Sequence, residues 1–387
     1  MYLTIAIVAI TSLVYFDIPT YIHNALIPRI EPKYFYWALA SIVAPILLLK
    51  FREFILYMTS AFPLWLFAEI IIHSFGLLDG NEATVHLILE RDQYLILTLL
   101  FGFTASLTRT ESYQGIFVIL AIAIPVLVII DFVNPGVFYP IGLPGTVYGR
   151  AAAMYLNANR ASEAILLTCL LAMPLLRLNY RMPLLLLAGA GIFVTFSRGL
   201  TLVWMLFCLF LLATRKLPKY SFVIFIVLVL VMPLLLGIFT SYLLAHEDQG
   251  LDNLLGRLDF FQSHSVDDDS AQGRIAVLKA SWRIFFENPI FGAGTGITSF
   301  QTFSWPFKIS THNQIALVAA EQGIFGIALW AWLLVILWRG RYFPDKRFQQ
   351  AAAVGVFLMA IFNHNMFNTL YWMLTFALVS GRRQVEA

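Results

Sequence analysis

The sequence predicts an all-α protein that crosses a membrane many times. Of its 387 residues, 60% are hydrophobic and only 12% are charged, whereas a soluble domain usually carries about 25% charged residues. That shortfall leaves too few charges to cover a water-facing surface. Apolar runs near the roughly 20-residue length needed to cross a hydrocarbon core recur along the chain. We therefore expect about 12 transmembrane helices, forming a single integral membrane domain over residues 1–387.

The apolar runs give the approximate bounds of the expected helices. The expected spans are 1–16, 34–50, 54–75, 93–108, 115–133, 160–177, 182–197, 199–214, 221–245, 313–337, 350–366 and 368–381. The first run starts at Met1 without a preceding basic segment, so we interpret it as a span and not as a cleavable signal peptide. Cys169 and Cys208 both lie inside apolar runs, which argues against a disulfide framework or a zinc site.

The basic residues predict the orientation, because lysine and arginine concentrate in short cytoplasmic segments. With a cytoplasmic N-terminus, 14 of the 25 basic residues fall in short cytoplasmic loops or in the C-terminal tail. Five of the others fall in one long segment, 246–312, and long segments cross a membrane largely regardless of charge. We predict that both termini are cytoplasmic and that segment 246–312 is external.

The external segment contains a second predicted element, an amphipathic helix over Ala271–Phe286. Asp269 or Ser270 is a suitable N-cap, because a short oxygen side chain accepts hydrogen bonds from the first free N–H groups. Asn288–Pro289 should end the helix. Three alternating glycines follow, where the backbone can approach a neighbour closely: Gly292, Gly294 and Gly296. We expect a helix on the outer membrane surface above a pocket, followed by a loop that leads back into the membrane.

Four cationic or titratable residues fall on the external side in this topology: Arg160, Arg198, Arg274 and His312. Guanidinium groups bind phosphate oxygens in pairs, and most strongly where water is partly excluded. We therefore predict an external site for an anion that carries phosphate. The alternatives are that Arg198 extends to the membrane interface, that Arg160 pairs with Glu163 one turn later, that Arg274 is solvated, and that His312 bonds to backbone at a helix start.

Other polar residues have structural interpretations. Glu69 and Glu321 fall inside expected spans, which favours buried acids that are paired or protonated. His364, near the last external turn, is a second titratable candidate. The acidic cluster Asp267–Asp269 is interpreted as a solvated cap, with a metal site as the alternative. We expect neither a metal nor another cofactor.

Several motifs along the chain carry a family resemblance. Asn157–Arg160 begins one span, and Ser197–Gly199 lies between two others. A longer set, in chain order, is Gly273–Arg274, Trp282, Asn288–Gly294, Thr311–Asn313 and Glu321–Gly326. Together they resemble the superfamily of O-antigen ligases and O-antigen polymerases of bacterial inner membranes. Ala158 stands where many relatives have proline, and the N-terminal third carries no motif of the family.

The resemblance implies a metal-independent, inverting glycosyltransferase of the GT-C type in a Gram-negative inner membrane. An O-antigen ligase transfers a glycan from undecaprenyl pyrophosphate to lipid A–core oligosaccharide on the periplasmic side. By motif, Arg198 and Arg274 would be catalytic and bind the donor pyrophosphate together with Arg160, and His312 would act at the acceptor hydroxyl. The secondary candidates are Asn157, Asn159, Asn313, Glu321 and His364.

Competing functions differ in the acceptor or in the class of protein. An O-antigen polymerase would share the donor chemistry but extend a lipid-linked chain. Relatives that are protein oligosaccharyltransferases usually carry more chain after the last span. Only about six residues follow the last expected span here, which disfavours that function. A transporter or flippase for lipid-linked glycans would predict inverted repeats and broken midplane helices, and no repeat is visible. The expected partners are the lipid-linked donor, the lipid A–core acceptor and the bilayer, and no nucleic acid.

Overall fold

The computed structural model describes residues 2–75, 82–140, 143, 146, 150–227, 230–231, 269–299, 305–307, 309–363 and 365–381. Over these ranges every regular element is a helix, which confirms the all-α prediction. The predicted span 221–245, the stretch 246–268 with Asp267 and Asp268, and His364 lie wholly or mostly outside the described residues.

The longer helices follow the apolar runs of the sequence. They are α1 (Tyr2–Tyr15), α3 (Pro32–Leu49), α4 (Phe51–Met58), α5 (Ala61–Phe75), α6 (Glu82–Ser106), α8 (Gly115–Val133), α9 (Ala158–Ala172), α10 (Leu178–Val194), α11 (Arg198–Ala213), α14 (Asp269–Glu287), α15 (Gln314–Arg339), α16 (Lys346–Phe362) and α17 (Leu370–Ser380). The short elements are α2 (Ile18–Tyr21), α7 (Thr110–Tyr113), a π-helix at Ile22–Leu26 and 3-10 turns at Ala153–Tyr155, Met173–Leu175 and Met366–Asn368.

The helices include candidate membrane spans. Among the described residues, three are long and apolar enough to cross a membrane, namely Pro32–Leu49, Thr110–Val133 and Gln314–Arg339. The number rises to five if each of two bent helix pairs forms one span. Shorter apolar helices are Leu178–Val194, Arg198–Ala213 and Leu370–Ser380. These helices agree with a membrane protein, whereas the number of spans stays a prediction.

The structure bends within the predicted span 54–75 and directly after the first predicted span. The run 54–75 is divided into α4 and α5, which are bent by 72°. The break lets Pro63 fall in the first turn of α5, where its missing N–H is not needed. The first run bends by 51° after Tyr15 and continues to Leu26. Asp17 takes a left-handed conformation at this bend, with φ of 52°, and Pro19 lies in the first turn beyond it.

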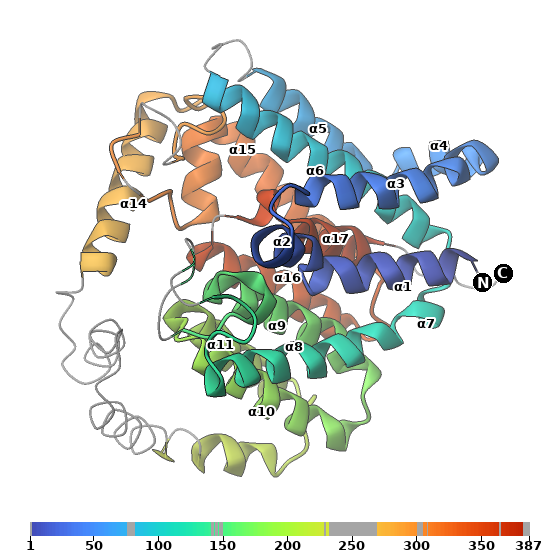
Figure 1. The fold of residues 1–387 in the computed structure, drawn as a ribbon, viewed down its shortest axis with the longest axis vertical. Helices are drawn as coiled ribbons and strands as arrows, with labels where there is room; N and C mark the ends of the chain where they lie inside the picture. The colour runs from blue at the N-terminus through green and yellow to red at the C-terminus, as the bar shows by residue number, and fades with distance from the viewer. Residues whose placement is uncertain are drawn as a thin grey trace. The chain divides into compact units, whose positions relative to one another are not determined.

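The chain is divided into two compact units. The first unit is Met1–Val14, Glu31–Ile116 and Gly273–Ala387, and the second unit is Tyr15–Ile30 and Phe117–Gln272. In the first unit the C-terminal helices pack on N-terminal ones. In Figure 1, α15 lies beside α5, and α17 beside α6, although these elements are far apart in the sequence. The Trp65 indole donates to the carbonyl of Leu329 at 2.9 Å across this interface.

The second unit is built around α9. This helix packs against α10 and α11, and nearly all of its side chains are buried. Cys169 and Cys208 are free thiols and are both buried, which agrees with the prediction that they form no disulfide. A buried helix satisfies its backbone groups internally, so α9 suits the interior of a helical membrane bundle.

Candidate functional site

Arg274 and His312 lie close together in the first unit. Arg274 is in the second turn of α14, which spans Asp269–Glu287 and confirms the predicted amphipathic helix. Burial of His312 and, second, the nearby Arg274 guanidinium lower the pKa of His312 to about 4. The imidazole is therefore neutral at neutral pH. The residue before His312 is Thr311, whose hydroxyl lies 2.6 Å from the Ser281 hydroxyl of α14. Thr311 and Ser281 are both fully buried.

Asn313 fixes where α15 begins. Its side-chain oxygen accepts a hydrogen bond from the Ala316 N–H at 2.9 Å, as an N-cap does. Its side-chain nitrogen donates to the Ile361 carbonyl at 3.1 Å. These contacts account for Asn313 as a capping residue, and they hold His312 immediately outside the N-terminus of the helix. The positive end of the helix dipole favours a neutral or anionic group at that place.

The predicted span 313–337 is interrupted at Gly323, where φ is 65° and ψ is −147°. The loop after α14 replaces the helical hydrogen bonds lost there. Ala293 N–H donates to Ala320 O at 2.8 Å, Gly294 N–H to Glu321 O at 3.0 Å, and Ile324 N–H to Pro289 O at 2.9 Å. A helix break inside a membrane protein is tolerated when neighbouring groups satisfy the freed backbone in this way.

The close approach predicted for the glycines is confirmed at Gly292. A Cβ at this position would lie 2.3 Å from the backbone nitrogen of Gln322. Gly292, Gly294 and Gly296 all have positive φ, of 72°, 97° and 86°. Only glycine takes up such conformations without strain. The loop that follows α14 is therefore docked against the break in α15 by its backbone.

Glu321 is a buried, paired acid, as the sequence predicts. Its partner is Arg91, with Nη1 at 2.5 Å from Oε2 of the carboxylate. The sequence pattern did not single out Arg91, because the predicted span begins at residue 93 and leaves Arg91 in the preceding loop. The structure begins α6 at Glu82, so Arg91 lies within the helix. A basic residue so near an apolar run was the available signal.

A second polar cluster lies beside the first. Gln322 donates to Glu69 at 3.1 Å, and Glu69 lies 3.7 Å from the His73 ring. The other ring nitrogen of His73 is 2.8 Å from Asp92. Glu69 and His73 are buried, so the prediction of a buried structural acid at Glu69 is confirmed. The cluster joins α5, α6 and α15.

The second unit holds the remaining predicted site residues. The Asn157 side chain caps α9 by accepting from the Asn159 N–H at 2.9 Å. Arg160, in the first turn of α9, interacts electrostatically with Asp17 and Tyr139. Arg198 is the first residue of α11. Arg160 and Arg198 are both partly exposed.

Arg150 connects these two helix starts and was not singled out by the sequence. Its Nη2 donates to the Asn159 side chain at 2.9 Å, and its Nε donates to the Thr195 carbonyl at 2.7 Å. The Thr195 hydroxyl in turn lies 2.6 Å from the hydroxyl of Ser162 on α9. These contacts tie the start of α9 to the turn that precedes α11. No local motif marks Arg150, because its partners come from distant segments.

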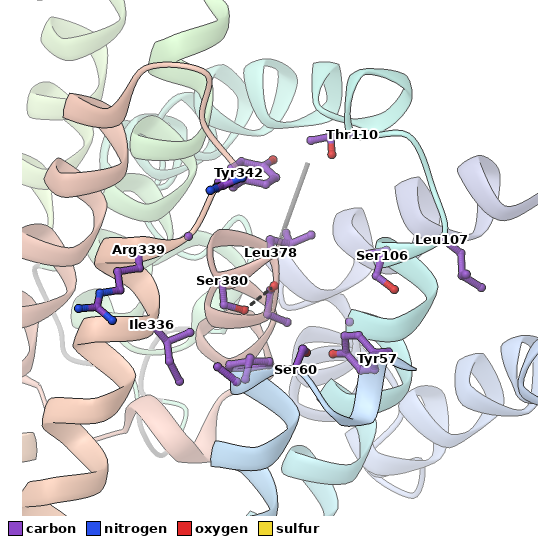
Figure 2. Close-up of a pocket in the computed structure, with 18 of the residues that line it drawn as sticks. Tyr57, Ser60, Ser106, Leu107, Thr110, Ile336, Arg339, Tyr342, Leu378 and Ser380 are labelled. Atoms are coloured by element: carbon purple, nitrogen blue, oxygen red, sulfur yellow. Dashed lines mark hydrogen bonds between the residues drawn. The ribbon is translucent and has the colours of Figure 1, made fainter. Parts of the chain in front are cut away.

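A cavity of about 720 Å³ lies in the first unit, toward the C-terminal end of α15. Figure 2 shows Tyr57, Ser60, Ser106 and Ser380 around it, whereas the Arg339 side chain extends away from them. His312 precedes the opposite end of α15, and no predicted site residue lines this cavity. Among the residues that the structure describes, no group of three or more His, Cys, Asp or Glu side chains is placed to hold a metal ion.

Part of the chain matches a known protein family. Residues 183–331 match the family model described as O-antigen ligase. The match covers fewer than half of the residues and supports a relation to the O-antigen ligase and polymerase superfamily. The matched segment contains Arg198, Arg274, His312 and Glu321, but neither Arg160 nor Arg91. No curated protein matches the chain.

The family match and the apolar helices together indicate the class of the protein. They support a membrane protein with a function of the O-antigen ligase or polymerase type. This type of function belongs to a glycosyltransferase-like enzyme in O-antigen and lipopolysaccharide processing, acting on lipid-linked glycans with a lipid acceptor in a membrane.

Proposed function

We propose that this protein is an O-antigen ligase. It transfers a glycan from undecaprenyl pyrophosphate to lipid A–core oligosaccharide, without a metal, at the periplasmic face of a Gram-negative inner membrane, and its fold is of the GT-C type. The observation that carries the proposal is a neutral imidazole, His312, beside a guanidinium, Arg274, within the segment that matches the family. This pair combines a proton acceptor with a binding group for phosphate.

In the proposed reaction, an acceptor hydroxyl attacks the anomeric carbon of the donor glycan. The new carbon–oxygen bond forms as the bond to the pyrophosphate oxygen breaks, so one displacement inverts the anomeric centre. His312 accepts the hydroxyl proton, and undecaprenyl pyrophosphate leaves with the bonding electron pair. General base catalysis of this kind typically contributes about 10²–10⁴-fold.

Arg274 has two roles in this scheme. Its guanidinium stabilises the negative charge that grows on the pyrophosphate as the bond breaks. The bound pyrophosphate also offsets the positive charge beside His312, which removes one of the two causes of the low pKa. Donor binding therefore raises the basicity of His312 when the base is needed.

The proposal is tested by reconstituting the purified protein in liposomes with undecaprenyl-pyrophosphate-linked glycan, lipid A–core and EDTA. A ligase forms glycan-extended lipid A–core in the presence of chelator, and His312→Ala and Arg274→Ala abolish the product. Arg283→Ala is the matched control, because Arg283 lies on the same helix with its side chain 76% exposed. Longer lipid-linked chains without lipid A–core product would assign the protein as a polymerase. Full activity of His312→Ala would refute the role of the base.

A further inference from the structure

Arg91 lies outside the segment that matches the family, and its guanidinium contacts two polar side chains. Its side chain is 5% exposed. Besides the 2.5 Å contact to Glu321, its Nη2 lies 3.5 Å from the second carboxylate oxygen, and its Nε donates to the Asn368 side chain at 2.9 Å. Three elements, α6, α15 and the turn at Met366–Asn368, therefore meet on one guanidinium.

Glu321 carries this interaction into the loop that follows α14. Its Oε1 accepts a hydrogen bond from the Thr298 hydroxyl at 3.0 Å. The Thr298 carbonyl in turn accepts the Thr311 N–H at 3.4 Å. Thr311 is the neighbour of His312 and contacts Ser281 of α14. We call these four residues, Arg91, Glu321, Thr298 and Thr311, the buried polar chain.

Every member of the buried polar chain is buried. The free energy lost when an ion pair is removed from water is about as large as the free energy gained from its attraction. A buried ion pair is therefore weak evidence for stability. The better supported role of a buried ion pair is to select one conformation among several. The backbone contacts at Gly292 and Gly323 already dock the loop, whereas the side chains specify where Thr298 and Thr311 lie.

We propose that Arg91 is a positioning residue that sets His312 against Arg274, acting through Glu321, Thr298 and Thr311. It does not touch the substrate. The effect on catalysis rests on the proposed transferase function, but the effect on the position of residue 311 does not. Arg91 thereby makes the N-terminal part of the chain necessary to the pairing of Arg274 and His312, which both lie after residue 270.

The neighbouring cluster makes the proposal testable. Glu69, His73, Asp92 and Gln322 join α5, α6 and α15 through hydrogen bonds that do not involve Arg91. These helices therefore keep a polar connection when the buried polar chain is altered. Replacing one charge alone leaves its partner buried and unpaired, which is strongly destabilising. The informative variant is the double replacement Arg91→Met with Glu321→Gln, which removes both charges.

The experiment uses a disulfide pair as a reporter that needs no substrate. Ser281→Cys and Thr311→Cys are introduced together with Cys169→Ala and Cys208→Ala, and iodine is added as a small oxidant. Because the two hydroxyl oxygens lie 2.6 Å apart, the cysteines should cross-link rapidly. We expect slower cross-linking with the double replacement and with Thr298→Val, and an unchanged rate with Glu69→Gln as the matched control. Equal rates in all variants would overturn the proposal.

Transfer is then measured in the same liposome assay, with native residues at 281 and 311. A displaced base predicts a fall in kcat of about 10²-fold with little change in KM for the donor, and no fall with Glu69→Gln. If the unaltered protein forms no glycan product, the proposed function fails, and the cross-linking rates still decide whether Arg91 positions residue 311. A loss of kcat with unchanged cross-linking would count against positioning.

Discussion

The state of His312 gives a prediction that can be worked from the structure. An ordinary histidine has a pKa near 6.5, and that of His312 is lowered to about 4. Burial is the larger cause and the Arg274 charge is the smaller. The charge therefore accounts for less than half of the fall. Replacing Arg274 by glutamine should raise the pKa, but to no higher than about 5.

The assay follows carbethoxylation of His312 as a function of pH, resolved by mass spectrometry. Only the neutral imidazole reacts, so the midpoint of the rate profile reports its pKa without requiring catalysis. We expect a midpoint near pH 4 in the unaltered protein and near pH 5 in Arg274→Gln. Arg283→Gln, which removes an exposed charge from the same helix, should match the unaltered protein.

The low pKa of His312 also predicts how the free energy of unfolding depends on pH. The unfolded state binds a proton near pH 6.5, and the folded state does so only near pH 4. The contribution of His312 to folding is therefore complete above pH 6.5 and declines as the pH falls toward 4. A midpoint near 6.5 in the unaltered protein would refute the reasoning, as would an unchanged midpoint in Arg274→Gln. Pyrophosphate should raise the midpoint in the unaltered protein alone.

Three further predictions follow from local geometry. Gly323→Ala should destabilise the protein in detergent by more than about 2 kcal/mol and so lower its melting temperature, because φ at Gly323 is 65°. Gly115→Ala is the control, since a Cβ at Gly115 has open space. Equal melting temperatures for the two variants would contradict the strain at Gly323. Arg150→Met and Arg150→Lys should both reduce glycan transfer, because only the guanidinium fork reaches both of its acceptors; full activity of the lysine variant would count against this. Cys169 and Cys208 should resist maleimide until detergent unfolding, because both are buried, and rapid labelling of the folded protein would show otherwise.

The sequence by itself determined the helical class and much of the local structure. Few charges and repeated apolar runs require backbone groups to be satisfied within helices. The Asn288–Pro289 pair located the end of α14, because proline acts within one turn. The start was predicted two residues late: α14 begins at Asp269, so the two expected caps, Asp269 and Ser270, lie inside the helix. The glycines after it predicted a close backbone approach. Glu321 stood out as a buried acid because a charge within an apolar run requires a partner.

Only the tertiary structure decided which distant groups meet. Arg91 and Glu321 are 230 residues apart, and no local periodicity encodes such a pair. The bend between α4 and α5 and the break at Gly323 depend on what packs beside them, since the hydrogen bonds lost at Gly323 are replaced by the loop at 289–294. Sequence patterns act over a few residues, whereas a buried charge is satisfied by whatever the fold brings within about 3 Å.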